Sequence, residues 1–138
     1  MAVDSEMPPE RTPPNSRIDA LAAPGLRTFF RIAEAWSLDE QEQMRVLGTS
    51  GLTILRAWRQ GGLSGFNEET LERISLLFGI FKAINTLLPD ATCADAWMRA
   101  PNKAPLLHGQ TAVAFMVGGD LERLRALRAY LDAEVGDG

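Results

Sequence analysis

The sequence lacks most of the residues from which enzymes build catalytic or metal centres. Its 138 residues include one cysteine, Cys93, and one histidine, His108. A single cysteine cannot form an internal disulfide, and one cysteine with one histidine cannot supply the cluster of ligands that a zinc site needs. Glycine-rich phosphate loops of the GxGxxG and GxxxxGKS kinds are also missing. We therefore expect no catalytic residue, no metal site and no cofactor, and we predict that the protein is not an enzyme.

Long apolar runs and a strong basic charge are missing as well. No run of about 18 apolar residues is present, and the N-terminal stretch does not have the pattern of a signal peptide. The formal net charge is −4, so the chain as a whole is not attracted to nucleic acid. Any DNA binding must come from a local basic surface. These features predict a cytoplasmic protein that makes no contact with a membrane.

Apolar side chains at helical spacing are what the sequence has in quantity. The hydrophobic content is 46%, which is ordinary for a globular protein. Apolar residues recur at intervals of three and four over residues 26–36, 71–84 and 121–131. No segment shows the sustained alternation of a β-strand. We predict an all-α fold of about seven helices, with the leucines of the last segment packed on the core rather than in a dimer seam.

Composition divides the chain into three predicted regions. Residues 1–22 hold four of the eight prolines and few large apolar groups, which predicts a flexible arm, or alternatively a segment that orders on binding DNA or a partner. Residues 23–65 are predicted to form a helix-turn-helix portion. Residues 66–138 are predicted to form a connecting core helix followed by a small helical domain.

Short polar motifs predict where several helices begin. The stretch SLDE at 37–40 predicts a capping box, in which Ser37 is the N-cap and Glu40 its partner. Ser50 is the predicted N-cap of the next helix, and Asn67 is that of the central helix.

The helix pair at residues 39–60 has the features of a helix-turn-helix. Two short helices flank a turn that contains Gly48, and the second helix carries hydroxyl and arginine side chains that can contact DNA bases and phosphates. Trp58 and Ile54 are expected in the core. Met44 stands where the helices should cross, a position that usually holds a small residue, so a helical hairpin with a solvated face is the alternative. The candidate DNA-binding residues are Arg45, Ser50, Thr53, Arg56, Arg59 and Gln60.

The C-terminal third combines several motifs in a fixed order. The stretch ADAWMRAPNKAPLLHGQTAVAFMVGGDLERLRALRAYLDA contains an A-W pair, a P-N loop, a short apolar helix, a glycine break and a leucine-spaced helix that ends near a tyrosine. This order resembles the toxin-binding domain of the Xre/MbcA/ParS antitoxin family. Upstream, FFRIAEAWSLDEQEQMRVLG and TLERISLLFGIFKAINTLLPD resemble that family's helix-turn-helix portion and connecting helix. The resemblance runs from about residue 25 to residue 134.

The resemblance implies a function and a set of partners. It implies an antitoxin that binds a RES-domain toxin, an enzyme that consumes NAD⁺, and neutralises it by covering the entrance to its active site. It also implies a helix-turn-helix that represses the operon, with operator DNA as a partner and the protein present as a homodimer or within a hetero-oligomeric toxin–antitoxin complex. One alternative is a dimeric helix-turn-helix repressor that binds no toxin. Another is an antitoxin whose helix-turn-helix no longer binds DNA.

The loop after Trp97 carries the residues that the resemblance assigns to toxin contact. Trp97, Pro101, Asn102, Leu106 and Gly109 match the family's loop pattern. Arg99 and Lys103 could meet acidic groups of the toxin, and His108 could contact the partner. Prolines suit such a loop because they limit the conformational states that are lost on binding. Trp97 has an alternative role as a core residue beneath the loop. The candidate toxin-binding residues are Trp97, Arg99, Pro101, Asn102, Lys103, Leu106 and His108.

Overall fold

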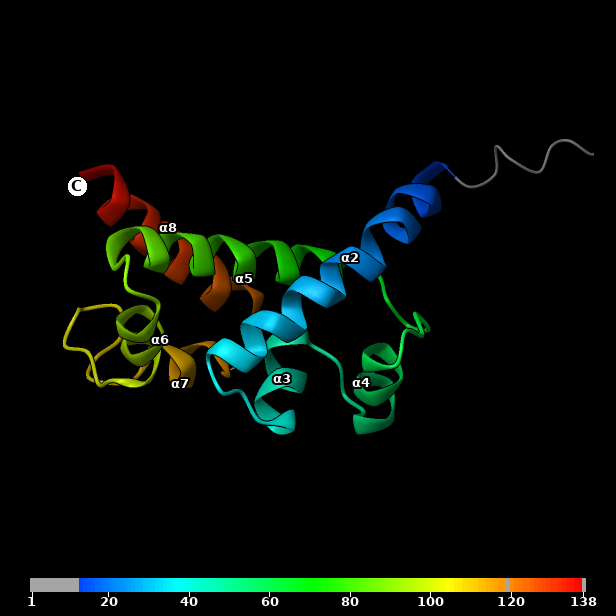
Figure 1. Cartoon of the computed structure of the whole chain (residues 1–138), viewed down its shortest axis with the longest axis horizontal. Helices are drawn as coiled ribbons and strands as arrows, with labels where there is room; N and C mark the ends of the chain where they lie inside the picture. The colour runs from blue at the N-terminus through cyan, green and yellow to red at the C-terminus, as the bar shows by residue number, and fades with distance from the viewer. Residues whose placement is uncertain (1–12, 119, 138) are drawn as a thin grey trace, which may run out of the picture.

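Every regular element in the described part of the chain is a helix. The computed structural model describes residues 13–118 and 120–137. These residues form seven helices and no strand, as the all-α prediction requires (Figure 1). The helices are α2 (Pro13–Ala35), α3 (Glu40–Leu47), α4 (Leu52–Arg59), α5 (Glu68–Leu87), α6 (Ala91–Arg99), α7 (Ala112–Met116) and α8 (Leu121–Asp137).

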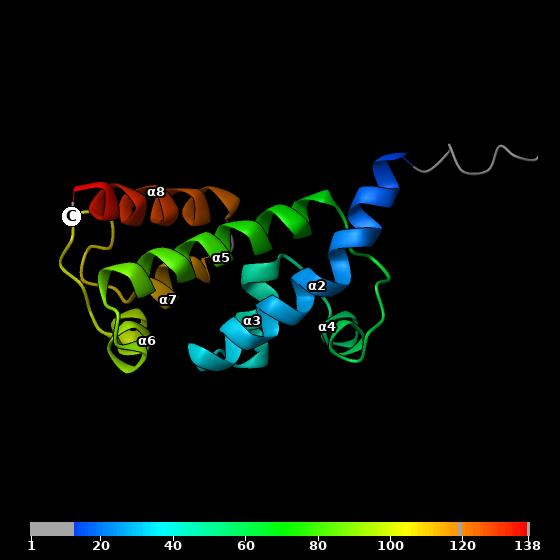
Figure 2. The same cartoon turned by 45° about the horizontal axis from the view of Figure 1, so that its top comes forward.

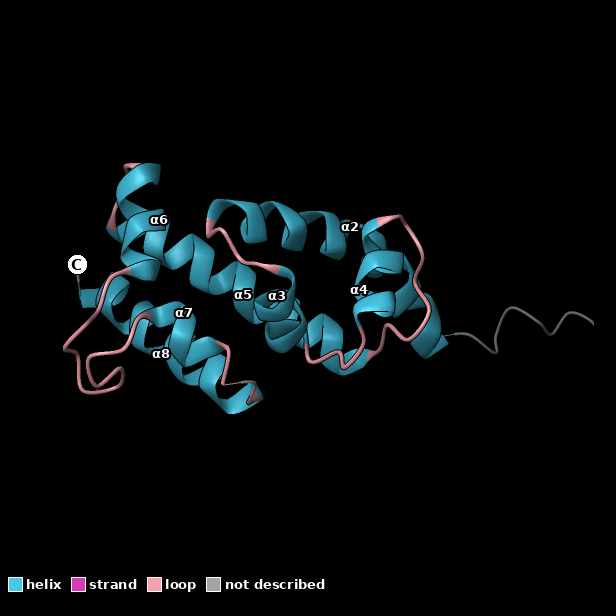
Figure 3. Ribbon diagram, turned by 90° about the horizontal axis from the view of Figure 1, so that it is seen from below, coloured by secondary structure: helices cyan, strands magenta, loops and turns pink. Residues whose placement is uncertain are grey.

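The long helix α5 is the centre of the arrangement. It packs against α8 along much of its length and is crossed by α2 on another side (Figures 1 and 2). The short helices α3 and α4 lie together below α2 and α5, and α6 and α7 lie at the other end of the molecule (Figures 1 and 3). The helix pair and the loop between α6 and α7 are therefore held on one scaffold, which α5 connects.

A single core runs through this scaffold. Trp36, the residue after α2, is 1% exposed and its ring lies 6.1 Å from that of Phe81 on α5. Leu124, Leu127 and Leu131 of α8 are buried, which confirms that the last helix packs on the core. Each large side chain buried in this way stabilises the fold by roughly 1.5–3 kcal/mol.

The N-terminal helix begins earlier than predicted. Residues 13–22 were expected in the flexible arm but belong to α2, whereas residues 1–12 lie outside the described part. Two prolines fill the first turn, where their missing N–H groups have no helical partner to lose. The alanine-rich stretch that follows favours helix, and Ala22 is 1% exposed, so packing holds this part of α2 in place.

The cap of α3 lies two residues beyond the predicted one. Asp39 is the N-cap: its Oδ1 accepts from the Glu42 N–H at 2.8 Å, and Glu42 accepts from the Asp39 N–H at 3.0 Å. The prediction of Ser37 and Glu40 was wrong because Ser37 lies in the turn after α2 with a φ of 57°. Ser50 is not a cap either, since α4 begins after Gly51 without a side-chain cap. Asn67 caps α5 as predicted, accepting from the Thr70 N–H at 3.0 Å.

Candidate functional site

The turn between α3 and α4 is built around Gly48. This glycine ends α3 in the left-handed region, with a φ of 74°, and its N–H donates to the Arg45 carbonyl at 3.3 Å. A Cβ at this position would also lie 2.7 Å from Nε of Arg73. Gly48 is therefore required twice, once for the backbone conformation and once to make room for a side chain from α5.

Arg73 ties this turn to the central helix. Arg73 is 6% exposed, its Nε donates to Glu69 at 2.9 Å, and its Nη1 donates to the Val46 carbonyl at 3.4 Å. The last carbonyls of a helix carry partial negative charge, so a buried guanidinium at the end of α3 is favourable there. Arg73 was not among the predicted residues. In the sequence, Arg73 stands at a position of α5 where the helical spacing predicts an apolar core residue, and this mismatch is the feature that could have identified it.

Two of the predicted DNA-binding arginines on α4 are held by one carboxylate. The Arg56 guanidinium donates to both oxygens of Glu40 at 2.9 and 3.1 Å, and Arg59 donates to Glu40 at 3.2 Å and to Gln43 at 2.9 Å. These hydrogen bonds, first from Arg56 and then from Arg59, lower the pKa of Glu40 to about 2. Glu40 begins α3, so the pairing joins the two helices of the motif across their outer face.

Of the other predicted DNA-binding residues, Thr53 on α4 and Gln60 at its C-terminal cap lie one turn from Arg56, Ser50 precedes α4, and Arg45 lies on α3. Arg45, Ser50, Thr53 and Gln60 are exposed, and their side chains form no ion pair within the described ranges. The face of α4 carries apolar groups too. Ile54 was expected in the core but is 36% exposed, because it lies at the edge of the α4 face that Leu55 and Trp58 bury.

The buried face of α4 is as expected. Trp58 is 3% exposed and its Nε1 donates to the Ser64 carbonyl at 2.8 Å. Met44 is half-buried and packs against the core, so a methionine is accommodated where the helices meet. The structure thus gives α4 one buried face and one face with exposed polar groups.

The loop between α6 and α7 is closed by hydrogen bonds at its base. Asn102 donates its N–H to the Gln110 carbonyl at 3.1 Å and accepts from the Gly109 N–H at 2.7 Å. The Asn102 side chain also accepts from the Ala104 N–H at 2.8 Å. His108 and Gly109 have φ values of 51° and 86°, which complete the turn. The backbone of residues 102–110, which we call the capping loop, is therefore fixed by its own contacts.

The predicted toxin-binding residues divide into exposed and packed groups. Pro101, Lys103 and His108 are exposed, and Lys103 and His108 form no ion pair with any described residue. Trp97 and Leu106 are half-buried against the core. Leu107, which was not predicted, is fully buried and anchors the loop. The sequence gives no clear signal for it, because two leucines stand side by side and their pattern does not show which one points inward.

Arg99 lies at the base of the capping loop and is bonded to the helix-turn-helix. Its guanidinium donates to the carbonyls of Trp36 at 3.1 Å and Ser37 at 2.8 Å, and to Glu42 at 2.7 Å. The hydrogen bond from Arg99 is the main reason why the pKa of Glu42 is lowered. Since Glu42 also completes the capping box of α3, one carboxylate connects the root of the loop to the first helix of the motif.

The arginines of α8 are also engaged in contacts. Arg125 pairs with Glu72 and Glu122, and Arg128 pairs with Asp132. The guanidinium of Arg123 lies 4.9 Å from the centre of the Phe115 ring. Helix α8 lies close enough to α5 and α7 for the side chains of Arg125 and Arg123 to reach them.

The described residues include few other groups that could bind a metal ion or react. Within residues 13–118 and 120–137, no three His, Cys, Asp or Glu side chains are placed to hold a metal ion. Cys93 is exposed. None of the helices described is both long enough and apolar enough to span a bilayer.

A glycine turn that joins two short helices, with a polar outer face on the second, defines the class of helix-turn-helix proteins. The family model of the antitoxin Xre-like helix-turn-helix domain matches residues 19–79. The uncharacterized protein y4oB of Sinorhizobium fredii is 34% identical over 111 residues, covering 80% of this chain and 84% of y4oB. The chain belongs to the family of Xre-type antitoxins. The matched domain is that of an antitoxin and DNA-binding regulator.

Proposed function

We propose that this protein neutralises a RES-domain, NAD⁺-consuming toxin by placing its capping loop over the entrance to the toxin's active site. The observation that carries this proposal is the closed loop of residues 102–110 on a chain of the Xre-type antitoxin family. We propose also that α4 binds operator DNA and represses the operon. The protein would act as a homodimer or within a larger toxin–antitoxin complex.

The geometry of the capping loop supports a covering role. Its backbone is fixed before binding, so little conformational entropy is lost when it meets a partner. Lys103 and His108 project from it without an internal partner among the described residues, and Pro101 adds a rigid apolar edge. These groups are the proposed toxin contacts. Arg99, Asn102 and Leu107 would position the loop through its base, and Trp97 and Leu106 would support it from the core.

The geometry of the helix pair supports DNA binding that is limited by Glu40. Thr53 on α4 and Gln60 at its C-terminal cap are exposed and available to bases or phosphates, and Arg45 is an exposed cation on α3. Arg56 and Arg59 can reach DNA only if they exchange Glu40 for a phosphate or a guanine edge. We therefore expect specific binding to be weaker than for a motif with the same arginines left unpaired.

The direct experiment measures NAD⁺ consumption by the RES-domain protein encoded beside this chain's gene. A stoichiometric amount of the purified chain should abolish consumption. A variant with Lys103→Ala and His108→Ala should need a higher concentration to do so. Full toxin activity in the presence of excess chain would contradict the proposal.

A helix-turn-helix repressor that binds no toxin is the second candidate. The observation in its favour is that the family model ends at residue 79, before the capping loop begins. Fluorescence anisotropy with the chain's own promoter distinguishes the candidates when it is combined with the NAD⁺ assay. DNA binding without inhibition of the toxin would favour the repressor.

A further inference from the structure

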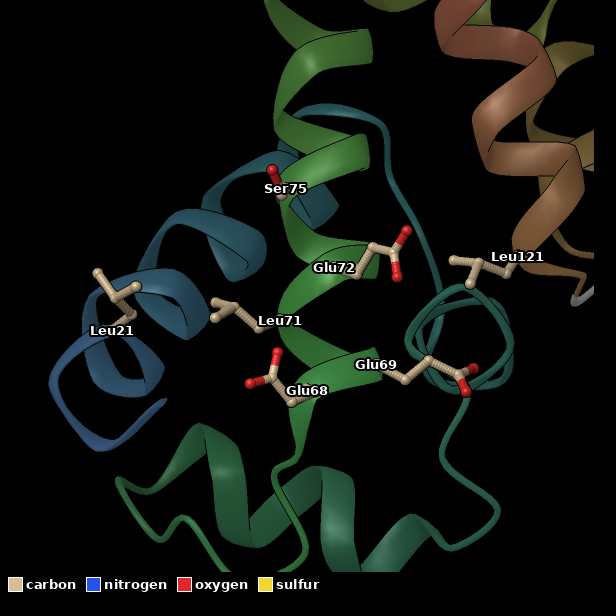
Figure 4. Close-up of a pocket in the computed structure, with 7 residues that line it drawn as sticks. All are labelled: Leu21, Glu68, Glu69, Leu71, Glu72, Ser75 and Leu121. Carbon is tan, nitrogen blue, oxygen red and sulfur yellow. The ribbon is translucent and has the colours of Figure 1, made fainter. Parts of the chain in front are cut away.

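An apolar groove runs between α2 and α5. Its walls include Leu21, Pro24 and Thr28 from α2, and its floor includes Leu71 and Phe78 from α5. Figure 4 shows the N-terminal part of this region, with Leu21 on α2, Leu71 and Glu68 on the side of α5 that faces α2, and Glu69 and Glu72 on the other side of α5. Adjacent hollows share lining residues, so the groove continues along α5 from Glu68 to Phe81.

The two most exposed of the large apolar side chains in the described residues lie in this groove. Leu21 is 43% exposed and Phe78 is 44% exposed. Neither contributes to the capping loop or to the outer face of α4. Exposed apolar side chains gathered in one groove mark a surface that binds another protein.

The floor of the groove has an internal symmetry along α5. Glu68, Leu71, Ser75, Phe78 and Lys82 follow one another at intervals of three and four, so they lie on one face of the helix. Ser75, a small residue, stands at the centre of this stripe, with Glu68 seven residues before it and Lys82 seven residues after it. The two ends, Glu68 and Lys82, carry opposite charges. One large apolar residue lies between each end and Ser75: Leu71 on one side and Phe78 on the other.

We propose that this groove is the interface of a homodimer in which the α5 helices of two copies pack antiparallel about a two-fold axis at Ser75. A two-fold axis presents the same surface from both copies, so the surface must be complementary to itself. Antiparallel pairing brings Glu68 of each copy to Lys82 of the other. It also brings Phe78 of each copy to the end of the groove that Leu21 and Leu71 line.

The proposed interface leaves the other surfaces free. Leu21, Pro24 and Thr28 recur on one side of α2, whereas the residues of α2 that face α4, such as Leu26 and Phe30, recur on the opposite side. No residue of α3 or α4 lines these hollows, and Figure 1 shows the two helices below α2 and α5. This inference rests on the homodimer of the proposed function and places its interface between α2 and α5. Its tests need neither toxin nor DNA.

Sedimentation velocity of the full chain, alone, tests the apolar part of the interface. The unchanged chain should sediment as a dimer at micromolar concentration, and Phe78→Asp should raise the dimer dissociation constant at least tenfold. Leu63→Asp is the matched control, because Leu63 is 36% exposed and lies on the α4 side of α2. It should leave the dimer intact. A monomeric unchanged chain, or equal effects of the two variants, would overturn the proposal.

A charge exchange tests the antiparallel arrangement. Glu68→Lys and Lys82→Glu should each weaken the dimer, because each places like charges opposite one another. The double variant restores opposite charges and should recover most of the lost affinity. Far-UV circular dichroism checks that every variant keeps its helices. A double variant weaker than both single variants, with helices intact, would contradict the placement of Glu68 against Lys82.

Discussion

The helix-turn-helix and the capping loop both present polar side chains, but they hold them differently. On the helix pair, the guanidinium groups of Arg56 and Arg59 are bonded to Glu40. On the loop, Asn102 fixes the backbone, while Lys103 and His108 form no ion pair with a described residue. The first surface must break internal contacts before its arginines can bind a partner. The second has its backbone in place and its charged group available.

This difference has a consequence for affinity. A partner of the loop gains contacts without losing internal ones, whereas DNA must compete with a carboxylate for each arginine. We therefore expect substitutions in the loop to weaken binding, and substitution of the competing carboxylate on the helix pair to strengthen it. This contrast predicts the effects of several variants, which decrease from Leu107→Ala to the titration of Glu40.

Leu107→Ala should have the largest effect, because it removes the anchor of the capping loop. Leu107 is fully buried, and replacement of such a leucine by alanine costs about 2–5 kcal/mol of unfolding free energy. Urea denaturation measures this loss, and toxin affinity should fall with it. Leu63→Ala, at an exposed position, is the control and should change stability by no more than about 0.5 kcal/mol. Similar stabilities for both variants would show that the loop is not anchored by Leu107.

Arg73→Met should loosen the turn between α3 and α4. The variant leaves the carbonyl of Val46 without its buried donor, at a cost of about 1–3 kcal/mol. Thermal or urea denaturation should show this loss, and DNA affinity should decrease because the two helices are held less firmly. Arg27→Met, at an exposed position of α2, serves as the control for loss of one positive charge. An equal decrease in DNA affinity for the two variants would assign the effect to charge alone.

Lys103→Ala with His108→Ala should separate binding from stability. Both side chains are exposed, so the unfolding free energy should change by no more than about 0.5 kcal/mol. Toxin affinity, measured by isothermal titration calorimetry, should fall about tenfold, which corresponds to about 1.4 kcal/mol. Unchanged affinity would remove these two residues from the proposed interface.

Glu40→Gln should strengthen DNA binding several-fold. Without the carboxylate, Arg56 and Arg59 are free to contact phosphates, and each added phosphate contact steepens the logarithmic dependence of affinity on salt by about 0.9. Anisotropy titrations with the promoter at several salt concentrations measure both quantities. The same slope for the variant and the unchanged chain would mean that the two arginines do not reach phosphates.

The titration of Glu40 should show the smallest effect. Its pKa of about 2 in the folded state lies below the ordinary value of 4.5, so the contact stabilises the fold above pH 4.5. This contribution is lost as the pH falls from 4.5 toward 2. NMR titration of the Glu40 carboxylate should give the low pKa, and Arg56→Ala with Arg59→Ala should return it toward 4.5. An ordinary pKa in the unchanged chain would contradict the pairing.

The sequence predicts some parts of this structure well and others poorly, for physical reasons. The helices could be predicted from the apolar spacing. Asn67 could be predicted as the N-cap of α5 because it stands directly before that helical pattern begins. SLDEQE contains two overlapping capping patterns, and the backbone turn at Ser37 decides in favour of Asp39. The pairing of Glu40 with Arg56 joins residues 16 apart, so it depends on how two helices pack rather than on local pattern.

The most direct test compares three forms of the chain in one assay of NAD⁺ consumption by the RES-domain toxin. The unchanged chain and the variant with Arg56→Ala and Arg59→Ala should inhibit at the same concentration, because the proposed toxin contacts lie on the capping loop and not on α4. The variant with Lys103→Ala and His108→Ala should require about tenfold more protein. Equal inhibition by all three forms, or a loss of inhibition confined to the α4 variant, would contradict the assignment of toxin binding to the capping loop.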